Sequence, residues 1–248
     1  MTQNFTKSEA ESWMLENMKQ IGERKDKYFE WNLSKFPYEK RKRILDIGCG
    51  PCTYFDSIMK LEPLFYCATD YSDVFLDEVN KLIEGKENCV TENVDILDEN
   101  SIAKLMVQKF DIIMCFDVIE HIKDDVKAFR NIAEILRKTG KGKLFVKVPA
   151  IQSLYGVNDY TVGHYRRYSK KSLAKALEES GFRITQIRYH NIFGILPWLI
   201  IGRVLKRKIA LSNSERSTFD VLVPVFRFIE NIIPPPIGLS LNCTCELK

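Results

Sequence analysis

Short apolar segments alternate with helical ones through the first part of the chain, and this alternation constrains the fold more than any other feature. The apolar segments cover about residues 44–47, 64–69, 110–116 and 143–148, and a further strand is expected over 88–94. Between them, apolar residues recur at steps of three and four, as they do on one face of a helix. Strands that are apolar throughout are buried on both faces. The order therefore predicts a doubly wound α/β domain, a mostly parallel sheet with helices on both faces.

The ends of the helices and the flanking segments complete the expected organisation. Ser72 and Asp98 are expected to begin two helices, and Gly140 to end a third. Residues 150–168, rich in Tyr, Gly and His, are expected to form a loop. We expect a single domain over 1–248, with an N-terminal helical cap over 1–40, a core over 41–190, an apolar and basic insertion over 191–237 and a last strand over 238–248.

The composition excludes several classes of protein. The 37 Lys and Arg against 33 Asp and Glu give a net charge of +4, which is mild for a dedicated nucleic-acid binder. No run of about 18 apolar residues occurs, so no membrane-spanning helix is expected. The first residues lack the apolar stretch of a signal peptide, and the seven cysteines are an odd number. A reduced, cytoplasmic protein is the expectation.

Two cysteine pairs have the spacing of metal ligands. They are Cys49 with Cys52, and Cys243 with Cys245. Cys49 lies inside a glycine turn, however, and the second pair lies on one face of a predicted strand. Since buried free cysteine behaves as a small hydrophobic residue, we expect no zinc and no other metal.

Glycines and carboxylates follow four successive predicted strands. They are Gly48 and Gly50, Asp70, Asp95, and Asp117 after Phe116. Ligands of open α/β sheets bind at this edge, beyond the carboxyl ends of the strands. Glycines let a ligand approach the backbone, and carboxylates accept hydrogen bonds from ribose hydroxyls or an adenine amine. The pattern predicts a nucleoside site.

Two motifs resemble those of class I S-adenosylmethionine-dependent methyltransferases, in the small-molecule subgroup of types 11, 12 and 23. Residues 44–51, ILDIGCGP, resemble the first motif of that family. Residues 110–113, FDII, with 117–122, DVIEHI, resemble its fourth-strand motif. The resemblance covers about residues 40–190 and implies a Rossmann-like, seven-stranded sheet whose last strand is antiparallel.

The resemblance also implies a cofactor and the residues that bind it. S-adenosylmethionine would lie with its methionine part at Gly48 and Gly50 and its ribose at Asp70. The adenine would lie at Asp95 and Ile96, and Phe116 would face the inner edge of the cofactor. The remaining residues implied at this site are Asp46, Cys49, Tyr71 and Asp117. One departure is Cys52, where the family usually has Gly or Ala, which allows a displaced turn.

The polar residues after the fifth strand are candidates for the acceptor side. His164 and His121 are the candidate catalytic bases, because histidine titrates near neutral pH. The candidate substrate-binding residues are Tyr155, Asp159, Tyr165 and Arg166, of which Arg166 suits an anionic group. The Asn-Pro-Pro-Tyr motif of relatives that methylate adenine or glutamine is absent. We therefore expect a small-molecule or lipid- or saccharide-linked acceptor and no nucleic acid.

Other interpretations stay open at this point. A dehydrogenase that uses NAD(P) also needs a glycine turn, but its third glycine is replaced here by Thr53. A non-catalytic S-adenosylmethionine-binding or membrane-associated scaffold protein is a further alternative. The apolar and basic stretch 191–208 suits a lid, a dimer surface or peripheral membrane contact, and the oligomeric state is not determined.

Overall fold

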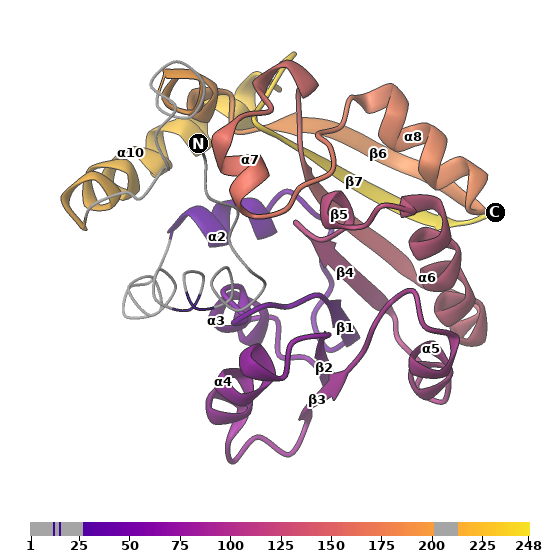
Figure 1. The fold of residues 1–248 in the computed structure, drawn as a ribbon. Coiled ribbons are helices and arrows are strands. Elements are labelled where there is room, and N and C mark those ends of the chain that lie inside the picture. Colours follow the sequence, from indigo (N-terminus) through magenta and orange to yellow (C-terminus); the bar gives the residue numbers. More distant parts are fainter. Residues whose placement is uncertain (1–11, 13–14, 16–26, 201–212) are drawn as a thin grey trace.

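A seven-stranded sheet forms the centre of the molecule (Figure 1). The computed structural model describes residues 12, 15, 27–200 and 213–248. The strand order is β3-β2-β1-β4-β5-β7-β6, and β7 is antiparallel to both of its neighbours while the other pairs are parallel. The strands are β1 (Arg43–Ile47), β2 (Phe65–Asp70), β3 (Cys89–Asn93), β4 (Ile112–Phe116), β5 (Lys143–Pro149), β6 (Phe182–His190) and β7 (Ser240–Leu247). The predicted fold class is confirmed.

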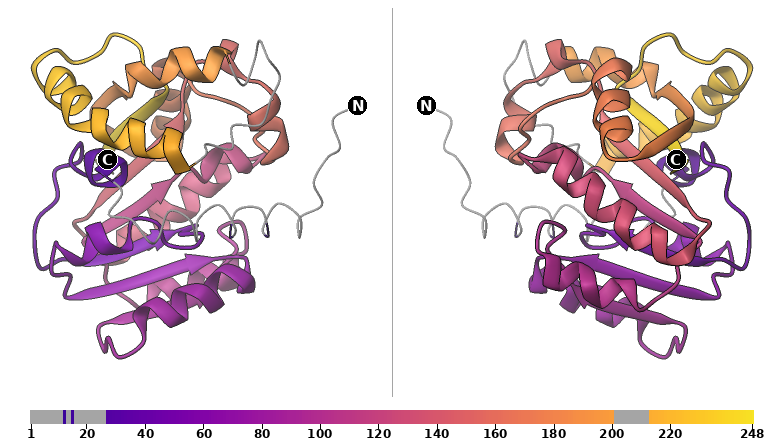
Figure 2. Two further views of the ribbon diagram at one scale, coloured as in Figure 1. Left: turned by 90° about the vertical axis from the view of Figure 1, so that its left-hand side faces the viewer. Right: turned by 90° about the vertical axis from the view of Figure 1, so that its right-hand side faces the viewer.

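Helices cover both faces of this sheet (Figure 1). On one face lie α5 (Glu99–Met106), α6 (Asp125–Thr139) and α8 (Lys170–Glu179). On the other lie α2 (Lys27–Leu33), α3 (Phe55–Met59), α4 (Asp73–Ile83) and α10 (Asn213–Ile232). In the turned views, α10 lies toward the β6–β7 side of the sheet and α4 toward the β3 side (Figure 2). This is the two-sided cover that the alternation of segments predicts.

The central strand β4 shows why these segments are apolar throughout. Ile113 and Cys115 belong to the core on the α6 face, whereas Ile112 and Met114 belong to the core on the α3 face. All four are buried. Successive side chains of a strand point to opposite faces, so a strand covered on both sides needs an apolar residue at every position.

Three of the predicted helix boundaries can be compared with the structure. The Asp98 carboxylate caps α5 by accepting from the backbone N–H groups of Asn100 and Ser101, and Gly140 ends α6 in the left-handed conformation. Ser72 stands before α4, but its hydroxyl makes no capping hydrogen bond. The backbone N–H of Ser72 instead donates to Asp70 Oδ1 at 2.9 Å. The prediction that the Ser72 side chain caps α4 is therefore wrong.

The segments outside the alternating part contain more helix than expected. The predicted loop 150–168 contains two short helices, η2 (Gln152–Leu154) and α7 (Val157–Thr161). Between β6 and β7 the chain forms η3 (Ile192–Gly194), α9 (Ile195–Pro197) and α10. Within the N-terminal helical cap expected over 1–40, the structure describes α2, and most of the residues before it lie outside the described part of the chain.

The stretch 191–208 lies only partly within the described residues, so its assignment as lid, dimer surface or membrane contact stays a prediction. Among the helices of the described ranges, none combines the length and the hydropathy of a membrane-spanning segment. The described part of α10 does expose apolar side chains, among them Val221, Val225, Phe228 and Ile232. Their spacing places them on one face of the helix.

Candidate functional site

The glycine turn after β1 contains two glycines with different roles. Both have positive φ angles, +65° at Gly48 and +53° at Gly50. A Cβ atom added to Gly48 would lie 2.5 Å from Val118 Cγ2, so this glycine permits the turn after β4 to pack against it. A Cβ atom added to Gly50 would meet no atom within 4 Å. Gly50 therefore borders open space at the carboxyl edge of the sheet, where a ligand can approach the backbone.

Asp70, at the end of β2, holds this turn in place. Its Oδ2 accepts from the Gly50 backbone N–H at 2.9 Å, while Oδ1 accepts from Ser72. Both carboxylate oxygens of Asp70 thus accept from the backbone around the turn. The predicted ribose-binding residue thus also fixes the glycine turn, a role that the sequence did not indicate.

Asp46 lies buried beneath the turn. It accepts a hydrogen bond from the Tyr66 hydroxyl at 2.9 Å. Burial raises the pKa of Asp46 to about 7, although the bond from Tyr66 opposes that change. The Tyr66 hydroxyl donates its proton to Asp46, so its oxygen can only accept from a second partner. This partner is the Cys52 thiol, because Cys52 Sγ lies 2.9 Å from the Tyr66 oxygen. Cys52 stands where the family usually has Gly or Ala. Its φ is positive, at 62°, so its backbone adopts the left-handed conformation.

The other residues predicted to bind cofactor follow β2, β3 and β4. Asp95 is exposed and accepts from the Leu97 backbone N–H at 2.9 Å, and Ile96 beside it is buried. Tyr71 is exposed, and Phe116 stacks on Phe36 with ring centroids 4.9 Å apart. The topology brings these positions to the same edge of the sheet as the glycine turn. Their contact with the cofactor stays a prediction.

Asp117 has a specific partner, the buried Lys147 of β5. The Lys147 ammonium forms an ion pair with Asp117 Oδ2. Burial alone would lower the pKa of Lys147, but the charge of Asp117 outweighs it and raises that pKa above its usual range. The pair fixes the turn after β4, where Asp117 has a positive φ of 55°.

Asp159 and His164 form the centre of the acceptor side. Asp159 has no exposed surface and accepts from Arg167 Nε at 2.8 Å, with its other oxygen bonded to the Gly156 N–H at 3.0 Å. His164 Nδ1 lies 2.8 Å from Asp159 Oδ1. Burial favours neutral Asp159, but the bond to His164 and the charge of Arg167 outweigh it and lower the pKa of Asp159. We therefore reassign Asp159 from substrate binding to the orientation of His164.

This pairing determines which nitrogen of His164 is free. Because Asp159 is a carboxylate, His164 Nδ1 carries the proton and donates it. The lone pair of neutral His164 is then on Nε2, which lies 3.7 Å from Glu120 Oε1. His164 is therefore oriented as a base or a ligand toward Glu120.

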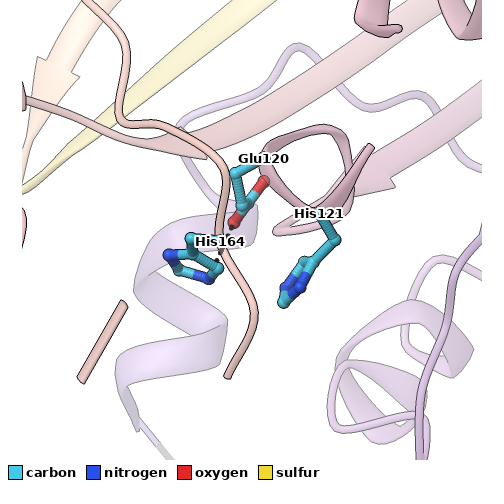
Figure 3. Close-up of side chains that lie close together, drawn as sticks. All are labelled: Glu120, His121 and His164. Carbon is cyan, nitrogen blue, oxygen red and sulfur yellow. Dashed lines mark ion pairs between the residues drawn. The ribbon is translucent and has the colours of Figure 1, made fainter. Parts of the chain in front are cut away.

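Glu120 and His121 face His164 from the short helix η1 (Ile119–His121), which follows β4 (Figure 3). The rings of His121 and His164 meet edge to face with centroids 4.6 Å apart. Burial and the neighbouring His164 lower the pKa of His121 to about 4, so the ring is neutral at pH 7. Burial and the charge of Asp117 raise the pKa of Glu120. The structure thus brings both predicted catalytic histidines together and adds a carboxyl group.

The predicted substrate-binding residues differ in their surroundings. Arg166 forms an ion pair with Asp125 at 2.8 Å and donates to the Lys123 carbonyl at 2.7 Å, so its guanidinium already has internal partners. The Tyr155 hydroxyl donates to the His164 carbonyl at 2.6 Å. The Tyr165 ring is exposed. Tyr165 is available to an acceptor, whereas Tyr155 and Arg166 support the loop that carries His164.

Sequence reasoning did not assign a role to Glu120 or Lys147, and it gave Arg167 the same role as Arg166, the binding of an anionic group. Lys147 did carry a signal, since it is the one charge between apolar residues in residues 144–148. Glu120 stands next to His121 in the recognised motif, but nothing in the sequence shows that it is buried. Arg167 cannot be told apart from Arg166 in the sequence, although their partners differ.

The comparison with protein families decides the classification of the chain. Residues 20–187 match the family described as "Methyltransferase domain". The chain belongs to the methyltransferase family. The predicted class, an S-adenosylmethionine-dependent methyltransferase, is confirmed, and with it the cofactor of this family.

Relatives and solved structures agree with this classification. The methyltransferase is 27% identical to the ubiquinone biosynthesis O-methyltransferase of Coxiella burnetii over 41% of this chain and 42% of the relative. It thus matches less than half the length of that relative. An S-adenosylmethionine-dependent methyltransferase from Archaeoglobus fulgidus has the same fold, with a TM-score of 0.59 and 17% identity over 94% of this chain and 99% of the other. The methyltransferase CalH, in complex with SAH, gives a TM-score of 0.55 and 16% identity over 84% of this chain and 52% of the other.

Proposed function

We propose that this methyltransferase transfers the methyl group of S-adenosylmethionine to a hydroxyl oxygen of a small-molecule or lipid- or saccharide-linked acceptor. The observation that carries the proposal is the orientation of His164. Its Nδ1 is bonded to Asp159 at 2.8 Å, which leaves Nε2 facing Glu120 of η1 at 3.7 Å. The name of the Coxiella burnetii relative, an O-methyltransferase, supports oxygen as the accepting atom.

The reaction requires alignment and the removal of one proton. The acceptor oxygen attacks the methyl carbon, the carbon–sulfur bond breaks, and the demethylated cofactor leaves with a neutral sulfur. The proton of the acceptor hydroxyl goes to His164 Nε2, and Asp159 stabilises the imidazolium that forms. Alignment of two bound reactants contributes about 7–11 kcal/mol at its best, and a positioned base contributes about 10²–10⁴ in rate.

A lipid-linked acceptor is favoured by the exposed apolar face of α10. Val225, Phe228 and Ile232 are each more than half exposed, with 53%, 65% and 62% of their surface accessible. Apolar residues on one face of a surface helix suit contact with acyl chains.

The test is transfer of a deuterated methyl group to a panel of acceptors, followed by mass spectrometry. The panel contains soluble phenols, saccharides and lipid-linked phenols in vesicles. The proposal predicts that one class gains the labelled methyl group and that His164→Ala lowers kcat by about 10²–10⁴. The affinity of the variant for the demethylated cofactor should remain that of the wild type.

Two results would count against the proposal. If the chain binds cofactor but labels no acceptor in the panel, the alternative of a non-catalytic cofactor-binding protein is preferred. If His164→Ala weakens cofactor binding as much as it lowers kcat, His164 is structural, and the acceptor side lies elsewhere.

A further inference from the structure

We propose that Glu120, His121 and His164 bind a divalent transition-metal ion beside the cofactor site. Each residue offers one ligand atom, and these three atoms all lie within 4.8 Å of one another. Figure 3 shows the side chains converging from two separate segments, the η1 turn after β4 and the loop after α7. Ligand atoms about 2.1 Å from a metal lie about 3–3.5 Å apart, so the cluster needs to contract by at most about 2 Å.

Glu120 supplies an independent indication of a ligand. The residue has no exposed surface, and neither of its carboxyl oxygens has a hydrogen-bond partner. The great majority of buried polar atoms are paired, so an unpaired carboxyl group needs a specific explanation. His164 Nε2 faces one of these oxygens, Oε1, at 3.7 Å. A cation between the two atoms would pair both of them.

His164 has the support that metal ligands usually have. A metal-bound histidine typically donates its other ring N–H to a carboxylate or a carbonyl group. His164 is bonded to the Asp159 carboxylate in this way. The Arg167 guanidinium in turn holds Asp159. The His164 ring is thus oriented before any metal binds.

The ligand types indicate which ions fit. Imidazole suits zinc, copper, iron and nickel, whereas magnesium and calcium prefer sets made of oxygen atoms only. Two histidines and one glutamate are the three protein ligands of several catalytic zinc sites, in which a fourth position stays open. We therefore expect zinc or a neighbouring first-row ion, with at least one open position.

The role of the ion rests on the proposed function. A metal ion lowers the pKa of a hydroxyl group bound to it. An acceptor hydroxyl in the open position would lose its proton to water, and its oxygen would then attack the methyl carbon as the carbon–sulfur bond breaks. In the metal-bound enzyme, His164 Nε2 would thus be a metal ligand and not the base that takes the proton. The metal ion would activate the acceptor hydroxyl.

The test measures metal binding directly and does not depend on activity. The full chain is freed of metal with a chelator and titrated with Co²⁺ by absorption spectroscopy and with Zn²⁺ by calorimetry. The proposal predicts one ion per chain and visible d–d absorption. Glu120→Gln should weaken Zn²⁺ binding at least tenfold, and Asp159→Asn should weaken it about 10–100-fold through the orientation of His164.

Cys49→Ser is the matched control, because Cys49 belongs to the other candidate ligand pair of this edge. The control should bind Zn²⁺ as the wild type does. The circular dichroism and the urea unfolding of each variant report whether it is folded. If a folded Glu120→Gln binds Zn²⁺ as the wild type does, or if the wild type binds none, the site does not exist. Metal binding without methyl transfer to any acceptor would contradict the proposed function but not the metal site.

Discussion

Gly48 and Gly50 are two residues apart, but their surroundings differ. We therefore expect substitutions at the two positions to have different effects. A side chain at Gly48 would collide with Val118, so it would lower stability, whereas a side chain at Gly50 enters open space. Gly85 is a matched control, since it also has a positive φ, of 74°, and open space around it. Alanine at either open position strains the backbone by about 1–2 kcal/mol.

We therefore predict that Gly50→Ala and Gly85→Ala lower the free energy of unfolding to a similar extent. Only Gly50→Ala should weaken binding of the demethylated cofactor, by at least about tenfold, because its methyl group occupies the space of the ligand. Urea unfolding and isothermal titration measure the two effects. Equal cofactor affinity in both variants would show that the cofactor does not approach Gly50.

Asp46 makes the stability of the protein depend on pH. Its pKa is about 7 in the folded protein because it is buried, and about 4 when unfolded. Between these values the folded protein holds a proton that the unfolded chain has lost, so stability falls as the pH rises. Asp46→Asn removes this effect. We predict that, from about pH 5 to pH 8, the wild type loses about 2 kcal/mol more than Asp46→Asn in urea unfolding. Parallel curves would mean that Asp46 ionises normally.

At the scale of elements, the sequence indicated the strands because β1, β2, β4 and β5 are mostly apolar and alternate with helical segments. The positions of the cofactor residues followed from topology alone, since parallel strands end at a common edge. The Asp159–His164–Arg167 network did not follow, because its three members are polar residues in a predicted loop. Only the folded chain shows that Asp159 is buried and that His164 meets His121 and Glu120 from another segment.

The Glu230 carboxylate links α10 to the end of β6. It lies 3.1 Å from His190 Nδ1 and accepts from the backbone N–H groups of Asn191 and Ile192 at 3.2 and 2.8 Å. Burial favours neutral Glu230, but these partners outweigh it and lower the pKa of Glu230. The link fixes the beginning of the long connection between the last two strands.

Removal of this carboxylate should destabilise the fold. We predict that Glu230→Ala lowers the free energy of unfolding by about 1–3 kcal/mol, because buried donors lose their acceptor. Glu134→Ala is the control, since Glu134 is half exposed and pairs with Arg137 at the surface. That control should change stability by less than about 1 kcal/mol. Equal effects in chemical denaturation would exclude a special role for Glu230.

At the scale of the whole molecule, one edge of the sheet collects the glycine turn, Asp70, the turn after β4 and the His164 loop. The motifs that resemble the methyltransferase family lie at this edge, as do the side-chain contacts described above. The predicted cofactor side consists of backbone and carboxylate groups that are fixed by β1 and β2. The proposed acceptor side consists of a loop that is fixed by Asp159 and Arg167. Substitutions on one side should therefore leave the function of the other side intact.

The central claim, that the cofactor binds at this edge, is tested most directly by calorimetric titration of the demethylated cofactor into the wild type and two aspartate variants. Asp70 and Asp98 each accept two backbone N–H bonds, but only Asp70 lies at the glycine turn. We predict one saturable site in the wild type, an unchanged affinity in Asp98→Ala, and a loss of about 1–3 kcal/mol of binding free energy in Asp70→Ala. No binding to the wild type, or the same affinity in all three proteins, would contradict the account.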